Sequence, residues 1–459
     1  MKGIKAIALA LTATTASASL IPHYFKRASS LPAVSVQGNA FFAGGNRFYI
    51  RGVDYQPGGS SGAVDPIADQ STCTRDITEF QKLKINTVRI YTVDNSQNHD
   101  ACMAALAAAG IYLALDVNTP KYSINQDDPA PSYNAEYLQS IFATIDAFQT
   151  YTNTLLFFSG NEDINSVATT SAAPYVKAVT RDMKNYINSR KYRAIPVGYS
   201  AADVDTLIYQ TADFMNCGDD AMARSDFFAY NDYSWCDPSS FSGSTWQAKA
   251  NYFANFSIPL FLSEYGCVKT TRSFEEVATL YGSQMTPSYS GGLVYEYSKE
   301  GTAAPADLYG LVEINGNDVT ELTDFGTLAT AFSNTPNPTG TGDYRPSGSP
   351  AICPGESSGW NVTTNGELPV FPSGAATYLK NGAGTGPGLS GSGSQNSGST
   401  SVAFASGSSV AATATSTSTS TSTSGSKKSA ADGRMSDSAP VMACGLVVAL
   451  STLLGMALL

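Results

Sequence analysis

Eight short apolar runs, separated by segments with helical spacing, dominate the chain between residues 48 and 297. The strand-length runs are Phe48–Tyr55, Ile85–Val93, Ile111–Val117, Leu155–Gly160, Ala194–Tyr199, Phe227–Asp232, Ile258–Glu264 and Gly292–Tyr297. Helical spacing precedes the second to fifth runs, at 76–83, 101–109, 137–151 and 175–189. Strands that alternate with helices imply a parallel sheet, and eight such units predict an α/β fold of the (β/α)₈ TIM-barrel type. The alternative, a doubly wound open sheet, has no Gly-x-Gly-x-x-Gly turn after the first run to support it.

Two of the runs end in a glutamate. Glu162 follows Leu155–Gly160, and Glu264 ends Ile258–Glu264. In such a barrel the functional groups lie at the carboxyl ends of the strands, so both glutamates are expected at one mouth. Two carboxyl groups across a bound sugar are what a glycosidase-type reaction needs, one as acid/base and one as nucleophile. Either glutamate alone could be an ordinary strand-end residue.

The other strand ends carry amides, tyrosines and one guanidinium, which suit sugar binding because amides read hydroxyls and aromatic faces stack on pyranose rings. Arg89 alternates with Val88 and Ile90, so its side chain is expected inside the barrel, where it would keep a neighbouring Glu264 ionised. Its alternative role is a structural ion pair at the barrel mouth. Asp116 could orient a substrate hydroxyl or cap the following loop. Tyr295 and Tyr297 could form a sugar platform, or Tyr297 could simply pack within its strand.

Charge and histidine content exclude several classes of function. The formal net charge is −11, which argues against nucleic-acid binding, because that depends on clustered Lys and Arg. Only two histidines occur in 459 residues, so a histidine-based metal site is not expected. We predict no metal and no cofactor. The 25 tyrosines of this acidic chain are compatible with a neutral sugar as partner.

The N-terminus and the cysteines indicate secretion. Residues 1–18 combine two lysines, an apolar stretch and Ala16-Ser17-Ala18, the pattern of a signal peptide with its cleavage site. Six of the seven cysteines lie in the body of the chain: Cys73, Cys102, Cys217, Cys236, Cys267 and Cys353. An even set in an oxidising compartment predicts three disulfides, although the spacing leaves fifteen connectivities open.

The composition changes after Cys353. We expect a catalytic domain over 31–355, an extension over 356–381, and a disordered stalk over 382–426, because that stretch is rich in Ser, Thr and Gly. Residues 427–459 hold small residues, a spacer and an apolar tail without a basic flank. That pattern predicts a GPI-attachment signal, with a plain membrane anchor as the alternative. Asn255 and Asn361 begin N-glycosylation sequons.

Six segments together resemble one known family: 52–61 (GVDYQPGGSS), 86–91 (NTVRIY), 98–103 (NHDACM), 158–162 (FSGNE), 263–267 (SEYGC) and 309–312 (YGLV). The chain is similar to the fungal GPI-anchored β-1,3-glucanosyltransferases of glycoside hydrolase family 72, the Gas/Gel/Phr type. The resemblance implies a (β/α)₈ barrel with Glu162 as acid/base and Glu264 as nucleophile. It also implies a sugar groove lined by Gln56, Tyr91, Asp116, Asn161, Tyr233, Tyr295 and Tyr297, and the disulfides Cys73–Cys102, Cys217–Cys353 and Cys236–Cys267.

The chain departs from that family pattern in two places. Asp163 stands where members often have an apolar residue, and it would raise the pKa of Glu162 if it faced the cleft. No cysteine lies between Cys353 and the tail, so the cysteine-rich carbohydrate-binding module of some members is missing.

The resemblance implies a monomeric, secreted enzyme at the outer face of the plasma membrane and in the cell wall. It would cut an internal β-1,3-glucan linkage and transfer the new end to a second glucan chain. A secreted β-1,3-glucan hydrolase, a β-mannanase or cellulase of the same clan, and a non-catalytic wall protein that binds glucan are the alternatives.

Overall fold

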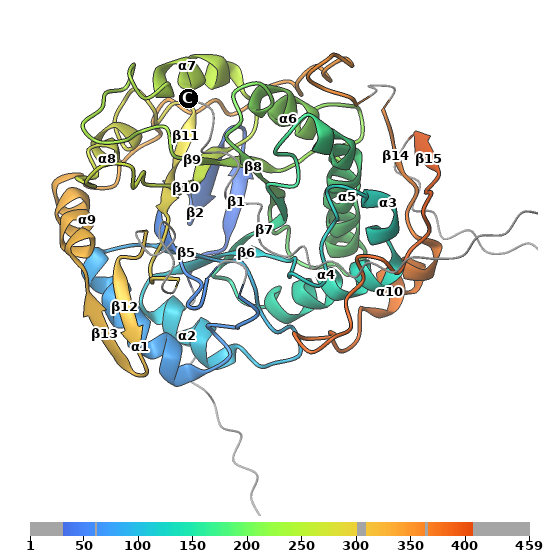
Figure 1. Ribbon diagram of the computed structural model, residues 1–459, viewed down its shortest axis with the longest axis horizontal. Coiled ribbons are helices and arrows are strands. Elements are labelled where there is room, and N and C mark those ends of the chain that lie inside the picture. Colours follow the sequence, from blue (N-terminus) through green and yellow to red (C-terminus); the bar gives the residue numbers. More distant parts are fainter. Residues whose placement is uncertain (1–30, 60–61, 301–308, 363–365, 407–459) are drawn as a thin grey trace, which may run out of the picture. The chain divides into compact units, whose positions relative to one another are not determined.

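The computed structural model describes residues 31–59, 62–300, 309–362 and 366–406. Eight parallel strands close into a barrel in the order β10-β11-β4-β5-β6-β7-β8-β9 (Figure 1). They are β4 (Ile50–Asp54), β5 (Thr87–Ile90), β6 (Tyr112–Asp116), β7 (Thr154–Asn161), β8 (Val197–Ala202), β9 (Phe227–Asp232), β10 (Leu260–Tyr265) and β11 (Tyr289–Val294). The predicted (β/α)₈ barrel is confirmed, and each strand overlaps its predicted run.

Helices surround the barrel on its outer side (Figure 1). They are α1 (Gln70–Leu83), α2 (Asp100–Ala108), α3 (Pro129–Ser132), α4 (Ala135–Phe148), α5 (Ala173–Ser189), α6 (Ile208–Met215), α7 (Trp246–Tyr252), α8 (Glu276–Leu280), α9 (Thr323–Asn334) and α10 (Ala376–Asn381). Side chains fix the starts of the two 14-residue helices: Asp69 caps α1 by accepting from the Thr72 backbone N–H, and Asn134 caps α4 by accepting from that of Tyr137.

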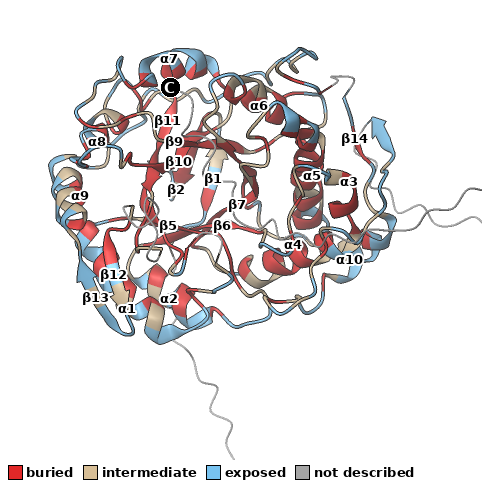
Figure 2. Cartoon of the chain, viewed as in Figure 1, coloured by how far each residue is buried: buried red, intermediate tan, exposed pale blue. Residues whose placement is uncertain are grey.

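A small antiparallel sheet closes the end of the barrel where the strands begin. It comprises β1 (Val34–Gln37), β2 (Ala40–Ala43) and β3 (Asn46–Phe48). The ring centroid of Phe41 lies 6.1 Å from that of Phe227 and 6.0 Å from that of Phe261, within a wholly buried cluster inside the barrel (Figure 2). This sheet was not among the predicted strands. With that end filled by apolar side chains, the polar chemistry is left to the opposite mouth.

Three disulfides hold the loops and helices around the barrel. Cys73–Cys102 joins α1 to α2, Cys236–Cys267 joins the loops after β9 and β10, and Cys217–Cys353 spans 136 residues of sequence. These are the pairs that the resemblance implied. The disulfide Cys236–Cys267 ties the loop that carries Tyr233 to the loop that follows Glu264.

The C-terminal segment corrects the predicted start of the stalk. Residues 382–398, here called the C-terminal arm, lie against the loops that follow β5 and β6 (Figure 1). The Gly388 N–H donates to Asn95 Oδ1 (3.0 Å), Lys121 Nζ to the Leu389 carbonyl (3.0 Å), and the Gly398 N–H to the Pro131 carbonyl (2.8 Å). Beyond the arm, β15 (Phe404–Ser406) pairs with β14 (Glu367–Pro369). Residues 382–406 are therefore ordered.

The reason for this correction is physical. The composition of the arm offers little apolar surface, so it predicts disorder. The arm is held instead by hydrogen bonds and by glycines that approach the barrel closely; a Cβ on Gly386 would overlap Asn95 Oδ1. Hydrogen bonds and close glycine contacts do not raise the hydropathy of a segment, so the sequence pattern could not predict this attachment.

Several predictions fall on residues outside those that the structure describes. They are the signal peptide at 1–18, the stalk over 407–426 and the attachment signal at 427–459. Within the described ranges, no helix has the length and apolar character needed to cross a bilayer.

Candidate active site

A polar layer lies across the mouth of the barrel, directly above its aromatic interior. Side chains two residues apart on a strand share a face, so Phe227 and Phe261 inside the barrel put Asn231 and Ser263 on the inner face nearer the mouth. Arg89, Asp116 and Ser200 occupy the same layer from neighbouring strands. The change from apolar to polar inner residues marks the floor of the site.

Arg89 organises this layer. It is fully buried, lies over the rings of Tyr91 and Phe158, and pairs with Asp116 through Nε (2.9 Å) and Nη2 (3.2 Å). Its Nη1 donates to Glu264 Oε1 (3.2 Å), and its Nη2 donates to Asn161 Oδ1 (2.8 Å). The guanidinium therefore connects β5, β6, β7 and β10 at the level of the reaction. It lies inside the barrel, where the alternation along its strand placed it.

Glu264 has hydrogen-bond donors on both of its carboxyl oxygens. Oε1 accepts from Tyr91 Oη (2.7 Å) as well as from Arg89, and Oε2 accepts from Tyr233 Oη (2.6 Å). Burial raises its pKa to about 7, while Arg89 and the two phenols act in the opposite direction. Hydrogen-bond donors cover both oxygens of Glu264, and one of these donors, Arg89, is cationic. The ionised form is therefore favoured more strongly at Glu264 than at a neighbouring carboxyl without such donors.

Glu162 follows β7 in a left-handed backbone conformation, with φ of 55°. Its N–H donates to the Ser200 carbonyl (2.9 Å), and its Oε1 accepts one hydrogen bond, from Asn231 Nδ2 (2.8 Å). Burial raises the pKa of Glu162, and no cation touches it among the described residues. Glu162 thus lacks the cationic donor that favours the anion of Glu264, and this environment suits the role of proton donor.

Asn231 aims its amide at Glu162 because its other end is occupied. Its Oδ1 accepts from Ser263 Oγ (2.8 Å), which leaves Nδ2 to face the acid. The sequence placed Asn231 at the end of the sixth run, among the strand-end amides, but did not single it out as a site residue. Its position at a strand end was the only available signal.

Tyrosines from three loops form a wall beside Glu264. The ring centroid of Tyr295 lies 6.5 Å from that of Tyr91, 6.3 Å from that of Tyr233 and 5.3 Å from that of Tyr309. Tyr309 was part of a recognised segment but was not predicted as a site residue, because it follows the last strand. These rings offer the aromatic surface that a pyranose needs.

Tyr297 is a correction. It is 0% exposed, packs against Tyr55 and Phe80, and donates to Asp76 Oδ1 (2.9 Å), so it faces away from the mouth. The prediction had continued the last strand to Tyr297, whereas β11 ends at Val294.

Two further predicted groove residues, Gln56 and Asp116, bind other residues of the site. Gln56 Oε1 accepts from the N–H groups of Tyr91 (3.1 Å) and Thr92 (3.0 Å), and its Nε2 donates to the Val64 carbonyl (2.6 Å). Its amide therefore fixes the segment that carries Tyr91. Asp116 forms an ion pair with Arg89, which is the structural ion pair considered above as the alternative role of that arginine.

Asp163 lies against the barrel wall. Its Oδ2 is buried without a hydrogen-bond partner and lies so close to Gly160 that a Cβ there would overlap it. Burial raises the pKa of Asp163 to about 8, so at neutral pH the group is mainly uncharged. In that state it adds little charge next to Glu162.

The remaining predicted and candidate positions are peripheral. Asn255 and Asn361 are both exposed, at the end of a 3₁₀ turn and in a loop.

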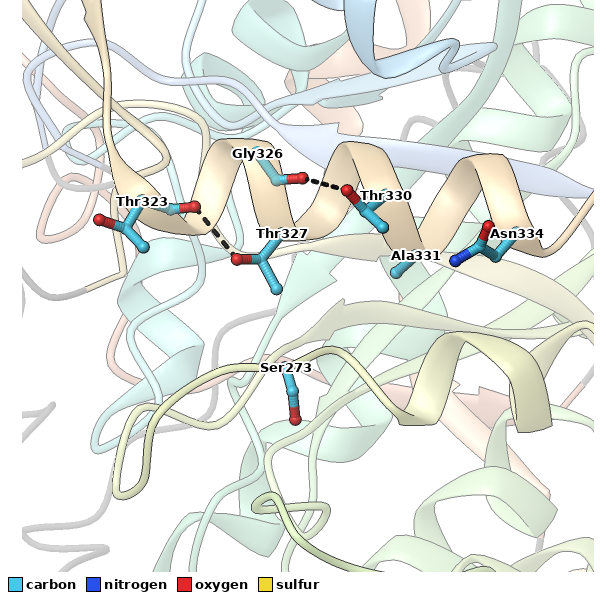
Figure 3. Close-up of a pocket in the computed structure, with 7 residues that line it drawn as sticks. All are labelled: Ser273, Thr323, Gly326, Thr327, Thr330, Ala331 and Asn334. Carbon is cyan, nitrogen blue, oxygen red and sulfur yellow. Dashed lines mark hydrogen bonds between the residues drawn. The ribbon is translucent and has the colours of Figure 1, made fainter.

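No group of three or more His, Cys, Asp or Glu residues in the described ranges could hold a metal ion. A hollow of about 470 Å³ along α9 contains no titratable side chain, and the hydroxyls of Thr327 and Thr330 donate to carbonyls of their own helix (Figure 3).

Comparisons with known proteins agree with this geometry. A family model described as "Glucanosyltransferase" matches residues 23–336. The 1,3-beta-glucanosyltransferase gel1 of Aspergillus fumigatus is 59% identical over 376 residues, covering 82% of each chain. The 1,3-beta-glucanosyltransferase GAS5 of Saccharomyces cerevisiae is 54% identical over 362 residues, covering 78% of this chain and 73% of that one. A solved structure of a Saccharomyces cerevisiae Gas2p mutant with laminaritetraose and laminaripentaose has a TM-score of 0.68 at 35% identity, covering 75% of this chain and 76% of that one.

Proposed function

The chain belongs to the glucanosyltransferase family, and from this we propose that it cleaves an internal β-1,3-glucan linkage and transfers the new end to a second glucan chain. The observation that carries the proposal is the unequal environment of two glutamates at one barrel mouth. Glu264 has hydrogen-bond donors on both carboxyl oxygens, including the Arg89 guanidinium, whereas Glu162 has a single amide. Such a pair supplies one carboxylate and one carboxylic acid at the same pH.

The reaction proceeds by double displacement. Glu264 attacks the anomeric carbon while Glu162 gives its proton to the departing glycosidic oxygen, which leaves a glycosyl ester on Glu264. Glu162, now a carboxylate, takes the proton of an incoming sugar hydroxyl as that oxygen displaces Glu264. The product is an elongated glucan, and both carboxyl groups return to their starting protonation states.

The length of the products tests the proposal. Incubation of a reduced laminari-oligosaccharide with the protein should give products longer than the substrate, resolved by chromatography or mass spectrometry. Only shorter products would identify a hydrolase instead. Glu264→Gln should reduce turnover by at least about 10⁴-fold, because it removes the nucleophile. Tyr297→Phe, outside the mouth, serves as the control.

We further propose that the mature protein is a monomer at the outer face of the plasma membrane, with a fraction in the cell wall, attached through a GPI anchor. The support is the N-terminal signal pattern and the C-terminal arrangement of small residues, spacer and apolar tail. Phosphatidylinositol-specific phospholipase C should release the protein from intact membranes. Retention after treatment would favour a plain membrane anchor, and light scattering on the released protein tests the monomer.

A further inference from the structure

One hydrogen-bond donor to each glutamate stands next to Asp232 in the chain. Asn231 Nδ2 donates to Glu162 Oε1 (2.8 Å). Tyr233 Oη donates to Glu264 Oε2 (2.6 Å). Successive side chains of a strand point to opposite faces, so Asp232, the last residue of β9, points away from the interior that Asn231 faces. Asp232 is 1% exposed and takes no part in the reaction described above.

Asp232 closes the turn that carries Tyr233. Its Oδ1 accepts from the backbone N–H of Ser234 (2.8 Å) and from the Ser234 hydroxyl. A carboxylate that accepts from the N–H two residues ahead forms an Asx turn, which bends the chain around the residue between them. That residue is Tyr233. The Asp232 carboxylate therefore fixes the backbone from which the Tyr233 ring extends toward Glu264.

A buried cation holds the other oxygen of Asp232. Lys249 lies on α7, is 1% exposed, and donates through Nζ to Asp232 Oδ2 (2.9 Å) and to Asp203 Oδ2. Burial lowers the pKa of Lys249, but Asp232 and Asp203 outweigh this effect and raise it above its ordinary value. Lys249 is therefore cationic near neutral pH. It connects the end of β9 to α7 and to the loop after β8.

We propose that Asp232 and Lys249 are positioning residues that hold the turn from which the Tyr233 hydroxyl reaches Glu264. In the described part of the chain, neither side chain contacts Glu162 or Glu264, so both act through Tyr233. A hydrogen bond weakens steeply when its donor shifts or turns, so the placement of this phenol matters. The inference rests on the proposed role of Glu264 as nucleophile.

Only a carboxylate serves both sides of Asp232, because both of its oxygens face donors. Ser234 lies on one side and Lys249 on the other. In Asp232→Asn the amide oxygen is drawn to the cation, since hydrogen bonds to charged groups are the stronger ones. The NH₂ group then faces the Ser234 N–H, and the turn loses its acceptor. Tyr233 is less firmly placed, the Glu264 anion loses a donor, and the pKa of Glu264 rises.

The acid limb of the kcat profile measures this effect, because Glu264 must be ionised to attack. We expect Asp232→Asn to move the limb up by about half a pH unit or more, as loss of a hydrogen bond to a charged group predicts. Loss of a negative charge would by itself lower the pKa of Glu264, so the upward direction separates lost positioning from lost charge. The other titratable groups that interact with Glu264 stay in place: Arg89, Glu162, Tyr91, Asp54, Glu296 and Tyr309.

Asp203→Asn is the matched control for Asp232→Asn. It removes the same charge beside Lys249, keeps an oxygen toward the ammonium, and leaves the Asp232 turn intact. Its acid limb should not move up. An Asp232→Asn limb that stays in place or moves down would overturn the proposal, and so would an equal upward shift in Asp203→Asn.

A double substitution tests whether the effect passes through Tyr233. Tyr233→Phe already removes the hydroxyl, so adding Asp232→Asn or Lys249→Met to it should move the limb little further, whereas additive shifts would overturn the proposal. Lys177→Met is the control for Lys249→Met. Lys177 is also buried, but its Nζ donates to the carbonyls of Phe214 and Cys217, so its loss should lower Tm without moving the limb.

Hydrogen exchange reports on the turn without reference to activity. The Ser234 amide should exchange about tenfold faster in Asp232→Asn than in the wild type. Unchanged exchange would overturn the proposal, and this nearly isosteric variant decides the matter even if Lys249→Met fails to fold. Full turnover by Glu264→Gln would refute the proposed function but would leave the exchange result standing.

Discussion

At the scale of single residues, the roles proposed for Glu162 and Glu264 differ because their neighbours differ. Both are glutamates at strand ends, and burial raises the pKa of each. Tyr91, Tyr233 and Arg89 surround only Glu264. Substitutions of these three neighbours should therefore affect Glu264 more than Glu162.

Tyr233→Phe should move the acid limb of the kcat profile to higher pH. The Tyr233 hydroxyl donates to Glu264 Oε2 (2.6 Å), and removal of a donor to the anion raises the pKa of the carboxyl, so a higher pH is needed to ionise it. We expect a shift on the order of one pH unit. Initial rates from pH 3 to 8 measure it, and Tyr252→Phe on α7 is the control. An unchanged or lowered limb would contradict the assignment.

Arg89→Lys should lower kcat at least about 100-fold, with a smaller change in KM. An ammonium cannot span Asp116, Asn161 and Glu264 as the guanidinium does, and disruption of a buried charge network costs about 3 kcal/mol or more. Steady-state kinetics with laminari-oligosaccharides checks the split. A loss confined to KM would show that Arg89 serves substrate binding instead.

The two glutamates could be predicted from the sequence because each ends an apolar run, which fixes the end of the barrel on which it lies. Asn231 and Tyr309 could not, because their roles depend on side chains from other strands. Tyr297 was misplaced because alternation along a run does not reveal where the strand stops. Local pattern thus identifies which residues reach the mouth more reliably than it identifies their contacts.

At the scale of secondary-structure elements, the strands were predictable because each is a continuous apolar segment of a parallel sheet, buried on both faces. The sheet of β1, β2 and β3 was missed because its strands are only three or four residues long and two of them, β1 and β3, carry polar or charged residues. The C-terminal arm was missed because hydrogen bonds and close glycine contacts hold it, and neither raises hydropathy.

Gly386→Val should detach the arm locally. The added side chain would overlap Asn95, whose Oδ1 accepts from the Gly388 N–H. Hydrogen exchange at the amides of Gly388, Ser394 and Gly398 should become about tenfold faster. Gly355→Val is the matched control, because nothing lies within 4 Å of a Cβ at that glycine. Equal protection in the two variants would mean that the contacts seen along the arm do not hold it.

At the scale of the whole molecule, buried carboxyls should make stability depend on pH. Burial raises the pKa of Asp163 and Glu276 to about 8 and that of Glu296 to about 10. Between pH 5 and 7 the unfolded chain has lost these protons while the folded protein keeps most of them. Unfolding therefore releases protons, and stability falls as pH rises.

Thermal unfolding should accordingly show a lower Tm at pH 7 than at pH 5. The decrease in Tm from pH 5 to pH 7 should be smaller in Glu276→Gln, which no longer carries one of the titrating groups. Lys177, whose pKa burial lowers to about 7, contributes the opposite slope as the pH approaches and passes 7, so the carboxyls dominate the lower part of this window. A Tm that rises across this window would show that these groups are ionised in the folded protein.

The two oxygens of Glu264 are not equivalent, and in the proposed reaction this asymmetry would select which of them becomes bonded to the sugar. Oε1 accepts from Arg89 and Tyr91, whereas Oε2 accepts only from Tyr233. Oε2 therefore has more electron density free for attack, and we expect it to become the bridging atom. Oε1 would then become the carbonyl oxygen of the covalent adduct, where the Arg89 guanidinium and the Tyr91 hydroxyl already donate to it and would draw electrons toward it. The Glu264 carboxylate would in this way be kept a good leaving group when the next hydroxyl attacks the anomeric carbon.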